Sequence, residues 1–412
     1  MPGVLVLLGP SSWEGPLVAG LAHPACPVSI VRRCLDTADL AASSAAGLAA
    51  VAVVGADAPR LDADVVDRVL ATGCAVVGIA GSDDDAGAER LSRLGVEVVV
   101  RVDAAQLGAA VRLVAAAVAE AESPDPRSEA APAAPSAPRG RLVAVWGPAG
   151  APGRTSTALA IADEAARRGV RTLLVDADTW APSVPVVLGL VDDGAGLASA
   201  CRRALGGALD VEVLASLVRE VHPDLLVLPG IPRAGRWTEV RAGALVDVLD
   251  VARELADLLV VDCAAPLEQD EELVFDTAAP RRNAATLLSL ECADEVVVVG
   301  GCEPHALVRL VTGLDELRAV VPGASVRVVV NRLRESVVGR RPAAAVADAL
   351  SRHAGLDDVV VVPDDPASYD AALREGRTLA DVAPRSPART ALRGLVTELL
   401  RDLALDGTRA AG

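Results

Sequence analysis

The residues best placed to do chemistry form a glycine-rich turn at 147–156, with the sequence GPAGAPGRTS. A strand-like run ends at Trp146 and helix-like residues begin near Arg154, the context that a phosphate-binding loop requires. In such a loop, backbone N–H groups and the helix N-terminus bind phosphate oxygens, and a hydroxyl residue holds magnesium. We predict that these parts are supplied by Gly150, Gly153, Arg154, Thr155 and Ser156.

The turn departs from the pattern GxxxxGK[ST] in two ways. The first glycine is expected at position 148, where Pro148 stands, and Gly147 lies one position early. Arginine replaces lysine at position 154, and all 39 basic residues of the chain are arginine. An ordinary glycine-rich connection between a strand and a helix is therefore the alternative interpretation.

Two further strand-like runs deliver carboxylates. The run Thr172–Asp176 continues to Asp178 within VDADTWAPSVPVVLGL, and the run Leu258–Asp262 ends in VVDCAAP. Ligands bind at the carboxyl edge of open α/β sheets, where a carboxylate can orient a magnesium-bound or attacking water. For any one of these aspartates, capping of the following turn is the alternative. Three aspartates at strand ends, combined with a phosphate loop, favour a nucleotide site.

These residues need a doubly wound α/β domain, which we predict over residues 141–412 with helices between the strands. The predicted strands are Leu142–Trp146, Thr172–Asp176, Leu225–Pro229, Leu258–Asp262, Glu295–Gly300, Val326–Asn331 and Val359–Pro363. The segment Pro387–Leu405 has apolar residues at helical spacing and charges of both signs. We expect it to dock on the domain rather than on a membrane.

The first part of the chain, 1–121, shows the same alternation of strand-like and helix-like runs. Its predicted strands are Val4–Leu8, Val28–Val31, Ala50–Gly55, Ala75–Ala80 and Val96–Val102, followed by a helix over Ala104–Glu120. Five such units favour a flavodoxin-like parallel sheet. Between the two domains, 122–140 is rich in proline and alanine and is predicted to be a linker.

Composition restricts the function further. The 412 residues carry a net charge of −17, which disfavours direct binding to nucleic acid. Seven scattered cysteines indicate a reduced, cytoplasmic protein. Apolar runs are interrupted by charge before they reach the about 20 residues of a membrane span, so we expect a soluble chain with at most peripheral membrane contact.

Over about Arg141–Leu403 the sequence resembles the MinD/ParA group of P-loop ATPases. The phosphate loop of that group, KGGxGKT, corresponds to residues 149–155, and its segment VDxDxxxPSL..LLGL corresponds to Val175–Leu190. The resemblance implies ATP with Mg²⁺ as cofactors. It places Asp178 near the attacking water, Thr155, Asp176 and Asp262 at the magnesium, and Asn331, Pro363 and Asp364 beside the base.

The resemblance also implies a catalytic set of Arg154, Asp178 and Asp262 and a nucleotide-dependent homodimer. Both lysines of the family loop are changed, to Arg154 and to Ala149. Arginine is a planar fork rather than a compact ammonium, so we expect hydrolysis to be weak or absent. Arg281 and Arg282 are candidates to replace the lysine that reaches across the family's dimer.

The N-terminal part resembles a response-regulator receiver without its phosphorylation residues. Gly55 stands at the acceptor position, Asp57 is two residues away, and Arg101 replaces the lysine. Trp13 is either an exposed partner-binding aromatic or a packed side chain. A pseudo-receiver joined to a MinD-like domain resembles the CpaE/TadZ proteins, which position type IVb pilus machinery at a cell pole, and related actinobacterial proteins are described as septum-site or partitioning factors.

Three functions are consistent with these features. The first is an ATP-dependent localisation or partitioning factor that binds pilus, secretion or division proteins at a pole or septum. The second is a pseudo-ATPase scaffold that acts through protein contacts alone. The third, a metabolic P-loop enzyme of the dethiobiotin-synthetase or cobyrinate-amidase kind, shares the fold but is expected to have an intact lysine.

Overall fold

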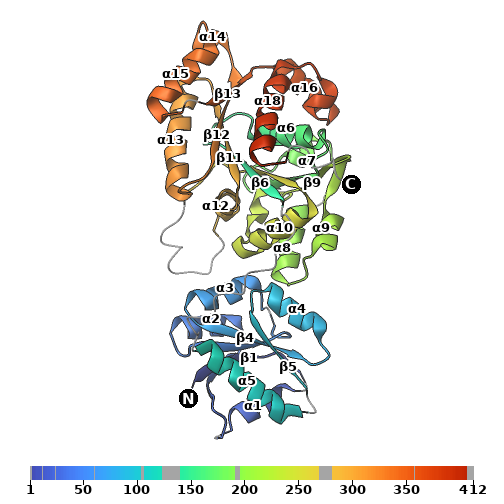
Figure 1. Ribbon diagram of the computed structural model, residues 1–412, viewed down its shortest axis with the longest axis vertical. Coiled ribbons are helices and arrows are strands. Elements are labelled where there is room, and N and C mark those ends of the chain that lie inside the picture. Colours follow the sequence, from blue (N-terminus) through green and yellow to red (C-terminus); the bar gives the residue numbers. More distant parts are fainter. Residues whose placement is uncertain are drawn as a thin grey trace. The chain divides into compact units, whose positions relative to one another are not determined.

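A computed structural model describes residues 2–11, 13–23, 25–59, 61–103, 106–122, 140–190, 195–268, 281–356 and 358–405. The chain forms two compact units, each built around its own sheet (Figure 1). The predicted linker at 122–140 lies, apart from its two end residues, outside the described residues. Among the helices that the structure describes, none combines the length and apolar character needed to cross a membrane.

The N-terminal unit contains five parallel strands in the order β2-β1-β3-β4-β5, the predicted flavodoxin-like arrangement. The strands are β1 (Gly3–Leu7), β2 (Ser29–Arg33), β3 (Val51–Gly55), β4 (Ala75–Gly81) and β5 (Val98–Val102). The helices are α1 (Glu14–Leu21), α2 (Thr37–Ala45), α3 (Ala63–Ala71), α4 (Asp85–Arg93) and α5 (Leu107–Glu122). Apolar side chains of α1 and α5 cover one face of the sheet, and those of α2, α3 and α4 cover the other.

The C-terminal unit contains eight strands in the order β13-β12-β11-β6-β10-β7-β9-β8. They are β6 (Arg141–Trp146), β7 (Thr172–Ala177), β8 (Arg219–His222), β9 (Leu225–Leu228), β10 (Leu258–Cys263), β11 (Glu295–Gly301), β12 (Val326–Leu333) and β13 (Val359–Pro363). All seven predicted strands are present and parallel. The prediction missed β8, which pairs antiparallel with β9 at the edge of the sheet.

The helices that accompany this sheet connect its strands and cover its faces. They are α6 (Arg154–Ala166), α7 (Val184–Val187), α8 (Gly196–Leu205), α9 (Val211–Leu217), η2 (Ala234–Glu239), α10 (Ala242–Leu255), α12 (Ala284–Glu291), α13 (Pro304–Val320), α14 (Glu335–Val338), α15 (Pro342–Ala354), α16 (Pro366–Glu375), α17 (Leu379–Val382) and α18 (Pro387–Asp402). The apolar face of α18 is buried in one core with α6, which confirms the docking expected for the C-terminal segment.

The central strand β6 determines where the site can form. Its neighbours are β11 on one side and β10 on the other, and the chain builds the β10 side of the sheet before it crosses to the β11 side. Asp262 on β10 is in register with Val145 of β6 and with Asp176 of β7. The carboxyl ends of these strands therefore bring two aspartates next to the turn that follows β6, at the position where open α/β sheets bind ligands.

Candidate functional site

The turn between β6 and α6 has the backbone of a phosphate-binding loop. Gly150 and Gly153 have φ values of 82° and 90°, a left-handed conformation that favours glycine. A Cβ atom on Gly153 would lie 2.2 Å from Nδ2 of Asn331, so the space admits no side chain. Helix α6 begins at Arg154, as predicted.

The first turn of α6 keeps its backbone N–H groups available. Helices α3 and α18 are capped by side chains, because Asp62 and Ser386 accept hydrogen bonds from first-turn N–H groups. At α6 the residue before the helix is Gly153, which has no side chain to act in this way. The N–H groups and the positive end of the helix dipole therefore face the turn, where an anion would be stabilised.

Asp262 and Asp176 are buried carboxylates with unsatisfied oxygens. Asp262 is fully buried and neither of its oxygens has a hydrogen-bond partner among the described residues, and the same holds for Oδ1 of Asp176. The other oxygen of Asp176 accepts hydrogen bonds from the N–H groups of Ser183 and Val184, both at 3.1 Å. Such orphaned oxygens are costly unless a cation or bound water satisfies them.

Burial also shifts the titration of this pair. It raises the pKa of Asp262 from its ordinary 3.8 to about 7, although the hydroxyl of Thr155 is near enough to oppose the rise. The Thr155 hydroxyl and the Asp262 carboxylate do not form a hydrogen bond. The Thr155 hydroxyl instead lies 3.3 Å from the hydroxyl of Ser183. Burial, and then the charge of Asp262, raise the pKa of Asp176 as well.

Thr155, Asp176 and Asp262 thus fit a magnesium ion bound together with phosphate. Oxygen ligands suit magnesium, which keeps several waters and commonly binds through one or two carboxylates and substrate phosphates. Among the described residues, no group of three or more His, Cys, Asp or Glu side chains is arranged to hold a metal ion by itself. The set therefore suits a metal that arrives with a nucleotide better than a permanent metal centre.

Asp178 is in a different state, because its carboxylate is already engaged. Oδ1 accepts hydrogen bonds from the N–H groups of Trp180 at 2.9 Å and Ala181 at 2.8 Å, which caps the turn after β7. Oδ2 lies 3.7 Å from Nη2 of Arg154, so the arginine of the phosphate loop forms an ion pair with this aspartate. The turn-capping alternative thus describes Asp178 in this structure, and its position near an attacking water stays a prediction.

The predicted base-contacting residues meet at a pocket of about 580 Å³. Its lining includes Gly153 and Ser156 of the loop together with Asn331, Pro363 and Asp364. Asn331 is buried at the end of β12, and its Nδ2 donates to the carbonyl of Pro152 at 3.1 Å. One side chain therefore connects β12 to the phosphate loop and fixes the wall of the pocket.

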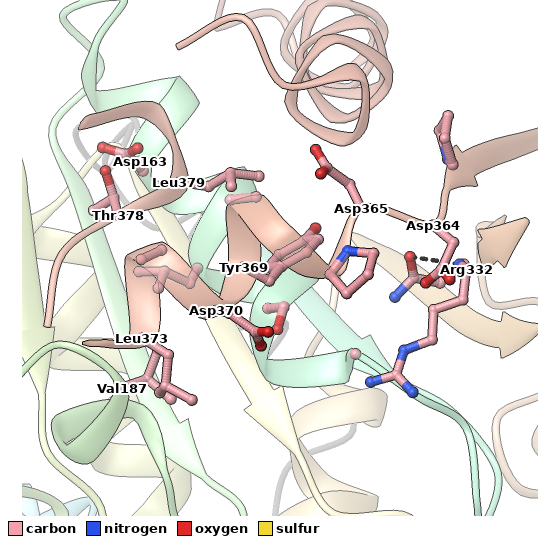
Figure 2. A pocket seen from close by; sticks show the side chains of 18 of the residues that line it. Asp163, Val187, Arg332, Asp364, Asp365, Tyr369, Asp370, Leu373, Thr378 and Leu379 are labelled. Carbon is pink, nitrogen blue, oxygen red and sulfur yellow. Dashed lines mark hydrogen bonds between the residues drawn. The ribbon is translucent and has the colours of Figure 1, made fainter. Parts of the chain in front are cut away.

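The pocket extends beyond these residues. Figure 2 shows Tyr369 of α16 between Asp365 and Asp370, with Arg332 and Asp364 toward one end of the view. Tyr369 is the single tyrosine of the chain. Burial raises its pKa to about 12, so the ring is neutral. Sequence reasoning missed Tyr369, whose position one helical turn after Asp365 was the available signal.

Arg282 lies near Asp178, the aspartate whose carboxylate is already hydrogen-bonded. Its guanidinium donates to the hydroxyl and the carbonyl of Thr179, and burial lowers its pKa while Asp178 opposes that effect. Its neighbour Arg281 is exposed. The sequence had indicated both arginines as candidates for a dimer contact, which stays a prediction. It did not predict that Arg282 would contact the rings of Trp180 and Trp237.

The carboxyl edge of the N-terminal sheet has different side chains from that of the C-terminal sheet. Oδ1 of Asp57 accepts a hydrogen bond from the N–H of Gly9 at 3.2 Å. Trp13 is 8% exposed, which rules out the exposed aromatic and supports the packed alternative. Arg101 pairs with Asp85 at 2.8 Å. Among the described residues, no cluster of carboxylates forms at this edge.

The fold, the glycine turn and the carboxylates define the C-terminal unit as a P-loop domain. No family model matches the chain. An uncharacterized ATP-binding protein of Methanocaldococcus jannaschii is 23% identical over 261 residues, which are 63% of this chain and 87% of that protein. The septum site-determining protein MinD of Synechocystis is 25% identical over 233 residues, 55% of this chain and 76% of that protein.

Solved structures of MinD proteins are also similar to this chain. The cell division ATPase MinD of Pyrococcus furiosus has a TM-score of 0.51 and 21% identity, over 64% of this chain and 99% of that one. MinD of Pyrococcus horikoshii, solved with Mg-ADP, has a TM-score of 0.51 and 20% identity, over 65% and 99%. The C-terminal unit thus has the same fold as these MinD proteins.

Proposed function

We propose that the C-terminal unit binds ATP with Mg²⁺. The phosphates would bind at Gly150–Ser156, and the base would lie in the pocket beside Asn331, Pro363 and Asp364. The observation that carries the proposal is Asp262, a fully buried carboxylate without a hydrogen-bond partner among the described residues, near a helix α6 whose first turn has no side-chain cap. A protein rarely keeps such a group unless a ligand satisfies it.

The chain's own residues have separate tasks in this site. Thr155, Asp176 and Asp262 hold the metal and its waters, while Asn331 fixes the loop against β12. When bound, magnesium neutralises negative charge on the β- and γ-phosphates.

Hydrolysis is proposed to be weak or absent. Oδ1 of Asp178 is occupied by two N–H groups of its own turn, which leaves one carboxylate oxygen at most to orient a water. Arg154 presents a planar fork in place of the compact ammonium of lysine. In the variant Arg154→Lys with Ala149→Lys, we expect phosphate release to rise about tenfold or more. No rise would mean that the defect lies elsewhere in the site.

Binding is tested by titrating the full chain with a fluorescent ATP analogue and magnesium. Removal of the hydroxyl in Thr155→Ala is expected to weaken binding about tenfold, because a hydrogen bond or ligand contact to a charged group is lost. Thr155→Ser keeps the hydroxyl and is the matched control. Absence of saturable binding by the wild type would reject this function and leave the scaffold, which the Arg154–Asp178 ion pair favours as the second candidate.

We further propose that nucleotide binding controls a homodimer and the contacts of a localisation factor. The support is the likeness to MinD proteins together with an N-terminal receiver-like sheet whose ligand edge is closed. A CpaE/TadZ-like role in positioning pilus or secretion machinery is our first choice, and septum-site or chromosome-partitioning control is the alternative. The chain would act in the cytoplasm and be recruited to a pole or septum.

The process is tested in two steps. Light scattering with and without ATP shows whether the dimer depends on nucleotide. A fluorescent fusion then shows whether the chain gathers at a pole or a septum, and whether Thr155→Ala disperses it. Uniform distribution of both the wild-type fusion and its Thr155→Ala variant would contradict the localisation role.

A further inference from the structure

Arg282 lies over two aromatic rings. Its guanidinium carbon lies 3.9 Å from the ring centre of Trp180 and 5.2 Å from that of Trp237, within the range of cation–π attraction. Nη1 donates to the hydroxyl of Thr179 at 3.0 Å, and Nη2 donates to the Thr179 carbonyl at 3.1 Å. The two ring contacts and the two hydrogen bonds to Thr179 together fix this cation in one place.

The same contacts fix the turn that Asp178 caps. The N–H of Trp180 donates to Asp178, and the indole N–H of Trp180 donates to Oδ1 of Asn283 at 3.0 Å. Asn283 is itself anchored, because its Nδ2 donates to the carbonyl of Glu268 at 2.9 Å. The turn Asp178–Ala181 is thus held by Asp178 on one side and by Arg282 and Asn283 on the other.

Charge explains why a second cation is needed there. The Asp178 side chain is 5% exposed and pairs with Arg154, the arginine of the phosphate loop. A buried carboxylate that loses its counter-charge is strongly destabilising. If Arg154 is drawn toward a phosphate, Arg282 still places positive charge near Asp178, across the intervening Thr179.

We propose that Arg282 is a positioning residue of the nucleotide site: it holds the turn Asp178–Ala181 and keeps positive charge beside Asp178, which allows Arg154 to leave that aspartate for the phosphates of a bound nucleotide. The inference rests on the proposed ATP binding. It makes Arg282 important for a nucleotide with a phosphate chain and unimportant for one that lacks the β- and γ-phosphates.

The test is calorimetric titration of the full chain with ATP and with AMP, both with magnesium. Arg282→Gln is expected to weaken ATP binding about tenfold, within the usual range of coupling between groups, and to change AMP binding less than about twofold. A purely structural role would affect both nucleotides alike. Equal losses for ATP and AMP would therefore overturn the proposal.

A double-mutant cycle tests the coupling directly. Asp178→Asn keeps the acceptor for the turn but removes the charge that retains Arg154, so ATP binding is expected to be at least as tight as in the wild type. In this background Arg282→Gln is expected to have an effect on ATP affinity of less than about twofold. A loss as large as in the wild-type background would overturn the proposal.

Trp180 provides a readout that does not depend on affinity. Binding of ATP is expected to change the fluorescence of the wild type, and the change is expected to be absent in Trp180→Phe and in Thr179→Val but retained in Thr179→Ser. If Arg282→Gln does not fold, Asp178→Asn tests the proposal by itself, because weaker ATP binding by Asp178→Asn than by the wild type contradicts the proposal. Absence of ATP binding by the wild type rejects the proposed function as well, whereas ATP binding with no Trp180 response rejects the positioning role alone.

Discussion

The two sheets of this chain differ in what lies at the carboxyl ends of their parallel strands. At the N-terminal edge, Asp57 accepts a hydrogen bond from the N–H of Gly9, and the indole nitrogen of Trp13 lies 3.8 Å from where a Cβ atom on Gly81 would stand. At the C-terminal edge, Asp262 is buried with both oxygens unpartnered among the described residues. The first edge is filled by its own side chains, and the second is left open.

The difference teaches that topology provides a place for a ligand but does not make a site. Both sheets offer the edge where open α/β folds bind ligands. At the N-terminal edge the buried side-chain atom without a partner among the described residues is the hydroxyl oxygen of Ser11, not a carboxylate, and Asp57 has Oδ1 occupied. At the C-terminal edge, unpartnered carboxylate oxygens lie beside a helix without a side-chain cap, and a magnesium nucleotide would provide partners for both.

The largest effect is expected at Asp262. Its pKa rises from 3.8 to about 7 on folding, so the folded chain keeps a proton that the unfolded chain has lost between these values. The contribution of Asp262 to the stability of the nucleotide-free protein therefore falls as pH rises from about 4 to about 7, by at most about 4 kcal/mol. Asp262→Asn removes this penalty and is expected to be more stable than the wild type at pH 8.

Urea unfolding without nucleotide, at pH 5 and pH 8, measures this difference. The gap between variant and wild type should widen at the higher pH. The same variant is expected to lose magnesium-dependent ATP binding, because the carboxylate oxygens are gone. A gap that is the same at both pH values would show that Asp262 is not an open, uncompensated group and would remove the contrast between the two edges.

Much of the fold follows from the sequence because the buried strands are continuous apolar runs. Strands covered on both faces, such as β6 and β10, are recognisable without any tertiary information. β8 was missed since its residues, Arg219–His222, are polar and partly exposed and pair antiparallel at the sheet edge. Its pairing with β9 depends on the tight turn between them, which apolar patterning does not reveal.

The candidate site was predictable where it is local. The glycines of the loop and the aspartates at strand ends are fixed by backbone geometry within a few residues of sequence. Which aspartate is open could not be predicted, because Asp178 is satisfied by N–H groups of its own turn whereas Asp262 is not. The contact of Arg282 with Trp237 could not be predicted either, since it requires two distant segments to meet.

The second prediction concerns the packed edge. Trp13→Ala is expected to destabilise the N-terminal unit by about 3 kcal/mol, because a large buried ring leaves a cavity. Trp13→Phe retains most of the ring and is the control, with a smaller loss. Hydrogen exchange of peptides within 2–121 locates the effect. Unchanged exchange in Trp13→Ala would mean that the ring does not close this edge.

The smallest effect is expected at Asp57. Asp57→Ala removes the acceptor of the Gly9 N–H and is expected to cost about 1 kcal/mol or less, because the side chain is exposed and water replaces part of the bond. Asp57→Asn keeps an acceptor oxygen and should lie closer to the wild type.

A chemical test sharpens the same point. A receiver-type phosphoryl acceptor needs clustered carboxylates to hold magnesium, and Asp57 instead has one oxygen occupied by the Gly9 N–H. Incubation with acetyl phosphate and magnesium is therefore expected to add no phosphoryl group to residues 2–121, as measured by intact mass and peptide mapping. Phosphorylation that disappears in Asp57→Asn would show that this edge is open after all, and that the two sheets differ in their ligands rather than in whether they bind one.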